Sequence, residues 1–177
     1  MLYLFRCSAV AIIYFCFLTG PADAAEVTTT HKNLTLNGRL MTAEGKSLKD
    51  GVVLLTHGTL AHNRMELIET LQKGLKERGL TSLAISLSLG LTKRTGMYDC
   101  KVPHRHRHED ALDEIGIWLN WLKAQGAGDI VLMGHSRGGN QTAWFAAERA
   151  PSEVKRVVLL APATWNAERR VAGFKRS

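Results

Sequence analysis

Two short, continuous apolar runs constrain the fold of this chain more than any other feature. Residues 51–58 read GVVLLTHG, and residues 129–133 read DIVLM directly before Gly134. A strand that is apolar at every position, rather than at alternate positions, is typical of a sheet covered on both faces, as parallel sheets are. The two runs therefore predict buried strands of a parallel sheet.

Strand-like and helix-like segments alternate along the rest of the chain. Apolar residues recur every three or four positions in residues 65–75 and 112–122, which predicts two helices, and residues 140–150 read as a third helix that ends before Pro151. An edge strand is expected over residues 34–41, further strands over 80–88 and 154–161, and a polar loop over 89–105. This order predicts an α/β fold, a doubly wound and mostly parallel sheet with right-handed crossovers.

The helix expected around residues 112–122 has a charge pattern that suits the helix dipole. Lys123 stands late in the segment, and four acidic residues stand early: Glu109, Asp110, Asp113 and Glu114. Trp118 and Trp121 lie beside the apolar stripe, so we expect them in the core rather than in a ligand cage.

Length and composition favour one globular domain. The chain has 177 residues, of which 45% are hydrophobic and 22% charged, close to the average of globular proteins. Its net charge of +7 is spread along the sequence and concentrated only near the C-terminus. A binder of anionic polymers would lose affinity steeply with salt. The chain lacks the interleaved aromatic and basic residues that single-strand platforms use, so we expect no nucleic-acid partner.

The first 24 residues read as a secretory signal peptide. Arg6 supplies a positive start, residues 9–18 are apolar, and Ala22-Asp23-Ala24 fits the small-x-small pattern before a cleavage site. We therefore expect an exported protein, periplasmic or secreted, with its α/β domain over residues 25–177. An uncleaved anchor is the alternative. The apolar run is shorter than the roughly 20 residues that cross a bilayer, and we expect no stable membrane anchor after cleavage.

The strand that ends at Met133 runs directly into the pentapeptide Gly134-His-Ser-Arg-Gly138, and a helix follows. A serine hydroxyl is a poor nucleophile unless it stands clear of the backbone and meets a base. A sharp turn between strand and helix exposes it in this way. Gly134 and Gly138 fit such a turn because side chains at these positions would collide across it. Ser136 is therefore the predicted nucleophile.

A second turn can complete this site. His57-Gly58-Thr59 follows the other buried strand, and ligands of such sheets bind outside the carboxyl ends of the strands. A tetrahedral intermediate needs two N–H donors aimed at its oxyanion. We expect the backbone N–H of Arg137 to be one donor and that of Thr59 the other, with Leu60 as the alternative if the turn differs by one residue.

With these two motifs, residues 51–163 resemble the first half of an α/β-hydrolase. The resemblance implies a serine hydrolase that acts on a small-molecule ester, thioester or amide without a cofactor. It also implies a Ser–acid–His triad in which the acid and the histidine follow the serine along the chain.

The expected partners of Ser136 are missing from this sequence. No histidine follows His135, and the carboxylates after Ser136, which are Glu148, Glu153 and Glu168, do not end a strand. We infer a truncated chain that lacks the C-terminal strands of the fold. A non-catalytic binding protein that retains the turn, a pseudoenzyme, is the alternative.

Three histidines, His104, His106 and His108, alternate with arginines in the loop before the second helix. The loop leaves the catalytic edge of the sheet, so these side chains could line the substrate pocket. Alternate residues of an extended chain share one face and could hold a metal ion. The flanking arginines disfavour a cation, and we expect no metal. A solvated basic loop is the third interpretation.

Overall fold

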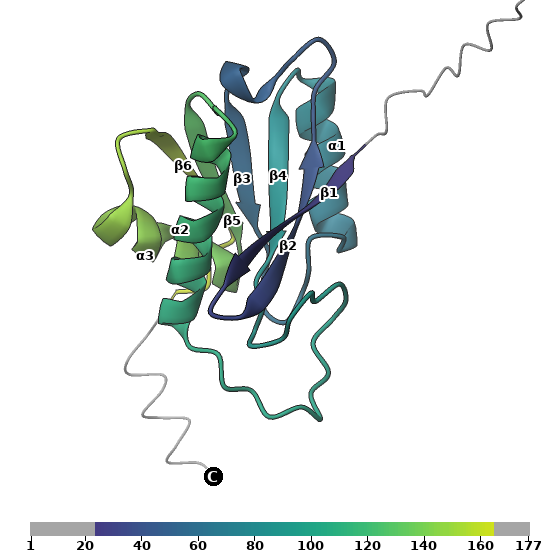
Figure 1. Ribbon diagram of the computed structural model, residues 1–177, viewed down its shortest axis with the longest axis vertical. Helices are drawn as coiled ribbons and strands as arrows, with labels where there is room; N and C mark the ends of the chain where they lie inside the picture. Colours follow the sequence, from purple (N-terminus) through teal and green to yellow (C-terminus); the bar gives the residue numbers. More distant parts are fainter. Residues whose placement is uncertain (1–23, 165–177) are drawn as a thin grey trace, which may run out of the picture.

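The computed structural model describes residues 24–164, and its six strands form one sheet (Figure 1). The spatial order is β1-β2-β4-β3-β5-β6. The strands are β1 (Ala25–His31), β2 (Leu34–Met41), β3 (Val52–Thr56), β4 (Thr81–Ser86), β5 (Ile130–His135) and β6 (Val154–Leu160). The signal peptide predicted for residues 1–24 lies, except for Ala24, outside the described residues.

Strands β4, β3, β5 and β6 are parallel, whereas β1 and β2 pair antiparallel with their neighbours. Three helices connect or follow them: α1 (Glu66–Glu77), α2 (His108–Ala124) and α3 (Arg137–Arg149), with a short 3-10 helix η1 (Leu48–Asp50) before β3. The predicted α/β class and mostly parallel sheet are confirmed. No described helix is long and apolar enough to cross a membrane.

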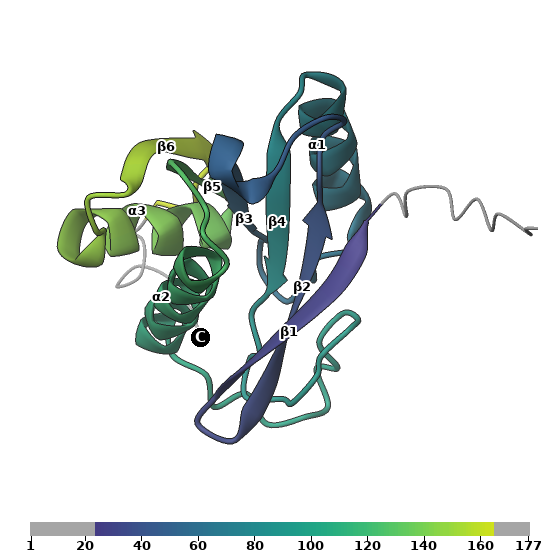
Figure 2. The ribbon, with the colours of Figure 1, turned by 45° about the horizontal axis from the view of Figure 1, so that its top comes forward.

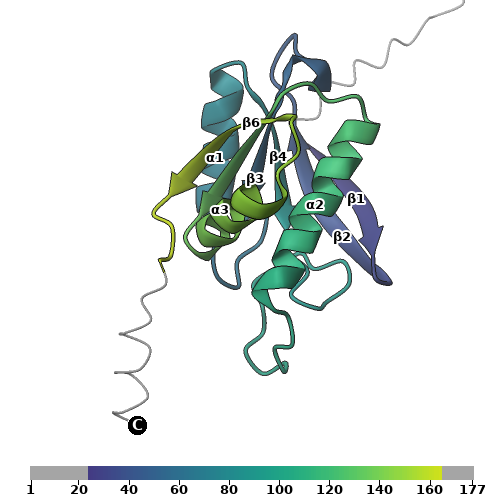
Figure 3. The same ribbon diagram turned by 90° about the vertical axis from the view of Figure 1, so that its left-hand side faces the viewer.

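The continuous apolar strands supply a core on each face of the sheet, as their sequences predict. Val52 and Leu54 of β3 pack in the larger cluster with residues of α2 and α3, whereas Val53 and Leu55 pack with Ile68 of α1 on the other face. Figure 3 shows α1 on one side of the sheet and α2 and α3 on the other. Alternate side chains of a strand point to opposite faces, so only an uninterrupted apolar run can serve both.

Strand β2 is not the edge strand that its sequence suggested, because β1 pairs along its outer side. The two strands form a hairpin whose turn residues, Lys32 and Asn33, have φ values of 46° and 64°. Positive φ at both central residues is what tight hairpin turns require. The sequence gives little sign of β1, since most of its residues are polar and none is buried.

Trp118 of α2 is fully buried against β2, as expected from its place beside the apolar stripe. A Cβ atom added to Gly38 would lie 2.9 Å from the indole ring, so the glycine makes room for the tryptophan. Trp121 packs partly buried against the same cluster, with its ring centroid 5.7 Å from that of Trp118.

A long connection between β4 and α2 lies at the carboxyl ends of the parallel strands (Figure 2). It covers residues 87–107, close to the loop predicted for 89–105. The turn after β3 and the turn between β5 and α3 lie at the same edge, because parallel strands end together. Every predicted site residue therefore belongs to this edge of the sheet.

Candidate active site

Ser136 occupies a strained turn between β5 and α3. Its backbone has φ 53° and ψ −121°, a region that residues other than glycine rarely adopt. The Ser136 N–H donates to the carbonyl of Leu160 at 3.0 Å, and the Ala163 N–H donates to the carbonyl of Ser136 at 2.8 Å. Both bonds come from β6 or the residues after it, so the neighbouring strand holds the turn in this conformation.

The glycines on either side of Ser136 stand where no side chain fits. A Cβ atom on Gly134 would lie 2.5 Å from Oγ1 of Thr142 and 2.6 Å from the carbonyl oxygen of Gly138. A Cβ atom on Gly138 would overlap the carbonyl oxygens of His57 and Thr56. The helix α3 therefore begins at Arg137, three residues earlier than its sequence predicted, with its first turn pressed against the end of β3.

The turn after β3 lies directly beside the serine. A Cβ atom on Gly58 would be 3.2 Å from the Cβ of Ser136. Thr59 and Arg137, the two residues expected to supply N–H donors, line the same small cavity, as does Leu60, the alternative donor. The structure thus brings the predicted nucleophile and the predicted oxyanion residues to one place.

His57 has no nitrogen free for proton transfer. Its Nε2 accepts from the Leu87 N–H and from Arg94, each at 3.0 Å, so the ring hydrogen is on Nδ1, which donates to the Gly58 carbonyl at 2.7 Å. Burial, together with the nearby positive charge of Arg94, lowers the pKa of His57 to about 3. His57 is therefore neutral, and its hydrogen bonds fix the turn that carries Thr59.

Arg94 joins the two loops that border the site. Its guanidinium donates to the carbonyls of Leu87 (2.8 Å), Gly96 (2.6 Å) and Ala61 (2.6 Å) as well as to His57. The side chain is buried, and burial lowers its pKa to about 10. The sequence did not distinguish Arg94 from the other basic residues of its loop, because two of its acceptors, His57 and Ala61, lie 37 and 33 residues away along the chain.

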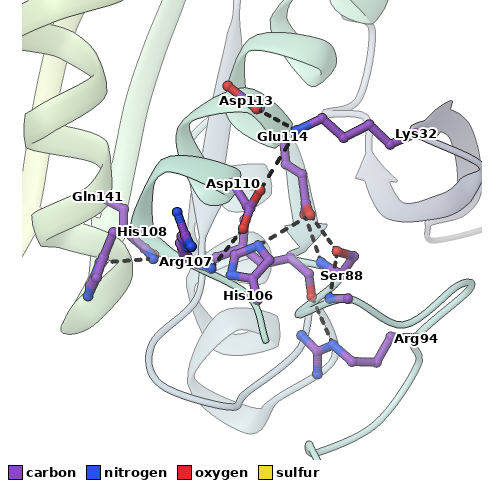
Figure 4. Close-up of polar contacts among 12 residues, drawn as sticks. Lys32, Ser88, Arg94, His106, Arg107, His108, Asp110, Asp113, Glu114 and Gln141 are labelled. Atoms are coloured by element: carbon purple, nitrogen blue, oxygen red, sulfur yellow. Dashed lines mark hydrogen bonds and ion pairs between the residues drawn. The ribbon is translucent and has the colours of Figure 1, made fainter. Parts of the chain in front are cut away.

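Glu114 is a buried carboxylate, although the sequence marked it only as one of four acidic residues early in the helix. It accepts hydrogen bonds from the Ser88 N–H at 2.7 Å and from the Ser88 hydroxyl at 2.5 Å (Figure 4). His106 lies on its other side, with Nε2 3.4 Å from Oε1. One signal was present in the sequence: Glu114 is four residues before Trp118 and so shares the buried face of the helix.

The three loop histidines gather around the small cavity that Thr59 and Arg137 line. His104 packs edge-on against Tyr98, with ring centroids 5.2 Å apart, and Nδ1 of His108 lies 3.4 Å from Nε2 of Gln141 on α3. Burial lowers the pKa of His104 and His108, and the positive charge of Arg137 adds to both shifts. Within residues 24–164 no group of three or more histidine, cysteine or acidic side chains is placed to hold a metal ion.

The described carboxylates that follow Ser136, Glu148 and Glu153, do not face the serine. Glu153 precedes β6 at the amino-terminal edge of the sheet and pairs with Lys123 of α2. Glu148 is exposed near the end of α3, and Glu168 lies outside the described residues.

Comparison with protein families gives one match, which covers most of the chain. A family model described as "alpha/beta hydrolase fold" matches residues 51–176. No curated protein matches the sequence.

Many solved structures resemble this chain. Est1E from Butyrivibrio proteoclasticus, in the structure with ferulic acid bound, is 25% identical with a TM-score of 0.64 over 77% of this chain and 52% of its own. Esterase Pf2001 from Pyrococcus furiosus is 22% identical, with a TM-score of 0.62 over 86% of this chain and 54% of its own. XC6422 from Xanthomonas campestris, described as a serine hydrolase without a lid, is 16% identical, with a TM-score of 0.64 over 83% and 66%. The chain spans about half the length of Est1E and of Pf2001.

Glu114→Gln should destabilise the fold. An amide offers one acceptor oxygen where the carboxylate offers two, and its NH2 group would face one of the two donors of Ser88. Loss of a hydrogen bond to a buried charge costs about 1.5–3 kcal/mol, so the free energy of unfolding in urea should fall by about that amount. Glu148→Gln on the exposed face of α3 should change it by less than about 0.5 kcal/mol. Equal stability of the two variants would contradict this role of Glu114.

His57 should make the protein less stable in acid. The unfolded chain protonates this histidine near its ordinary pKa of 6.5, but the folded chain does so only near 3. Between these values the unfolded state binds the extra proton. The contribution is therefore fully present above pH 6.5 and is lost as the pH falls, by at most about 1.4 kcal/mol per unit.

The variant His57→Gln keeps a polar acceptor but does not titrate. Its free energy of unfolding should fall less steeply than that of the wild type between about pH 6 and about pH 4. Asn120→Gln, a change at an exposed residue of α2 that does not titrate, should leave the slope as it is. A wild-type slope in His57→Gln would show that another group carries the acid sensitivity.

Proposed function

This chain belongs to the alpha/beta hydrolase family, and we propose that it is an exported serine hydrolase of small-molecule esters, with thioesters and amides as the related substrates. The observation that carries the proposal is the strained turn of Ser136 beside the residues expected to form an oxyanion hole. Strain of this kind costs about 1–3 kcal/mol and collects at functional sites.

In the proposed reaction, Ser136 Oγ attacks the carbonyl carbon of the ester while a base takes its proton. The N–H groups of Arg137 and Thr59 stabilise the oxyanion, and loss of one such donor typically costs about 10²–10³ in rate. The intermediate then expels the alcohol, which receives the proton. Water hydrolyses the acyl-serine by the same steps in the second half of the reaction.

Known structures support esters as the substrate class. Two of the similar structures are described as esterases, and a third, Est1E, holds ferulic acid. At these identities the likeness concerns the fold, so the ester class rests on the analogy together with the Ser136 turn of this chain.

The base is the open component of this proposal. His57 is saturated by hydrogen bonds, and no histidine follows His135. His106 has a carboxylate partner, since Oε1 of Glu114 lies 3.4 Å from its Nε2. Its ring lines the cavity that Thr59 and Arg137 share, so it is the first residue to test as proton acceptor.

A second function follows from the same observations. If no base reaches Ser136, the turn and its cavity would bind a carbonyl compound without cleaving it. The saturated His57 favours this alternative, because it removes the histidine nearest in sequence to the oxyanion turn.

Fluorophosphonate labelling of the folded full chain separates the two functions. An activated Ser136 should give a single adduct in the intact mass, because the reagent phosphonylates only nucleophilic serines. The adduct should disappear in Ser136→Ala and persist in Ser152→Ala, a change at an exposed serine. Labelling of His104→Gln, His106→Gln and His108→Gln then identifies the base. Absence of an adduct on folded protein contradicts the hydrolase and favours the binding protein.

Export has its own test. We propose that residues 1–24 direct the chain out of the cytoplasm and are removed. Protein recovered from the periplasm or medium of a Gram-negative host should begin at Ala25 by intact mass. Ala24→Arg should block processing, because the cleavage site requires a small residue. Full-length wild-type protein retained in the cytoplasm would contradict export.

A further inference from the structure

We infer that the cavity beside the Ser136 turn binds a carboxylate of the substrate, so that the chain selects anionic esters over neutral ones. The inference deepens the proposed function and rests on it, because the ligand is a substrate only of an active hydrolase. The binding of an anion at this place can be tested without any hydrolysis.

The cavity has a volume of about 460 Å³ and lies between the 98–103 segment and the oxyanion residues. Its wall is held in place by the chain itself. The Tyr98 N–H donates to the carbonyl of Leu60 at 3.0 Å, and the Tyr98 hydroxyl donates to the carbonyls of Val102 and Pro103 at 3.3 and 3.2 Å. Thr59, Leu60, His104 and Arg137 line this cavity and the small one next to it, so the two spaces adjoin.

The lining of both cavities is positively charged. Lys101 and Arg137 line the larger one, Arg107 and Arg137 the smaller one, and no aspartate or glutamate is among the described residues that line either. His104 and His108 add no charge at neutral pH, because the pKa of each lies below its ordinary value. The positive charge therefore comes from lysine and arginine.

Three nearby carboxylates accept hydrogen bonds within the protein. Asp99 accepts from the Lys101 N–H at 2.9 Å, Asp110 accepts from the Arg107 N–H at 2.8 Å, and Glu114 is bound to Ser88. In the described part of the chain, no ion pair joins the side chain of Lys101 or Arg137 to an acidic group. Both cations are exposed and can meet a ligand.

Arginine and lysine favour a carboxylate ligand through charge-assisted hydrogen bonds. Arg137 follows the nucleophile directly, so its side chain reaches the cavity while its backbone N–H serves the oxyanion. A substrate whose ester carbonyl meets Ser136 can place a carboxylate, carried on its acyl or alcohol part, within this cavity. Monoesters of dicarboxylic acids have this form, and so do hydroxy acids that are acylated on the hydroxyl group.

Benzoate and benzamide, which match in shape and differ in charge, serve as probes. Their binding to the folded, wild-type full chain is measured from amide chemical shifts in ¹⁵N-labelled protein. Benzoate should bind about five- to tenfold more tightly at low salt, with shifts at Thr59, Leu60 and Lys101. Salt should reduce the preference, since the cations are exposed.

Charge-neutral variants locate the site. Arg137→Gln and Lys101→Gln should each lower the preference for benzoate about threefold, whereas Lys93→Gln should leave it unchanged. Lys93 is exposed in the same loop but lines neither cavity. Equal binding of the two probes overturns the inference, and so does an equal effect of Lys93→Gln, which would indicate a diffuse basic surface.

Fluorophosphonate labelling of the same preparation separates this inference from the proposed function. Labelling of Ser136 without a preference for benzoate leaves the hydrolase standing and overturns the anion site. A preference for benzoate without labelling supports the anion site and contradicts the hydrolase.

Discussion

At the carboxyl end of β3, the first turn of α3 approaches the sheet so closely that no side chain fits between them. A Cβ atom on Gly138 would overlap the carbonyl groups of Thr56 and His57, and one on Gly134 would overlap Thr142. This approach sets Ser136 beside Gly58 and holds its φ at 53°. A strained backbone of this kind persists only where its surroundings over-determine it. Here the pairing of β5 with both β3 and β6 does so.

Buried polar contacts then attach the loops to this frame. Arg94 donates to the carbonyls of Ala61, Leu87 and Gly96 as well as to His57. Glu114 binds Ser88 at the start of the loop before α2. Buried charges are costly unless they are hydrogen-bonded, so each of these groups favours the single loop arrangement that satisfies it. The wall of the cavity is therefore fixed when the chain folds, before any ligand arrives, which reduces the ordering cost of binding.

The structure divides its ionisable groups into two kinds. His57, Arg94 and Glu114 are buried and serve the architecture of the edge, whereas Lys101 and Arg137 are exposed and line the cavity. The neutral state of His57 follows from this division, because Arg94 donates to the same nitrogen that a proton would occupy. The histidine beside the predicted oxyanion turn is thus a structural residue here.

The sequence by itself determined the α/β class, the parallel strands and the strand–turn–helix at Ser136. These features rest on local rules: apolar runs for strands with two covered faces, and glycines where a turn leaves no space. It did not reveal β1, whose polar residues carry no burial signal, and it did not show that Glu114 is buried. Only the tertiary structure decided the roles of His57, Arg94 and Glu114, since most of their hydrogen-bond partners lie between 7 and 37 residues away along the chain. Long-range hydrogen bonds leave no periodic trace in a sequence, and the folded sheet edge alone brings their donors and acceptors together.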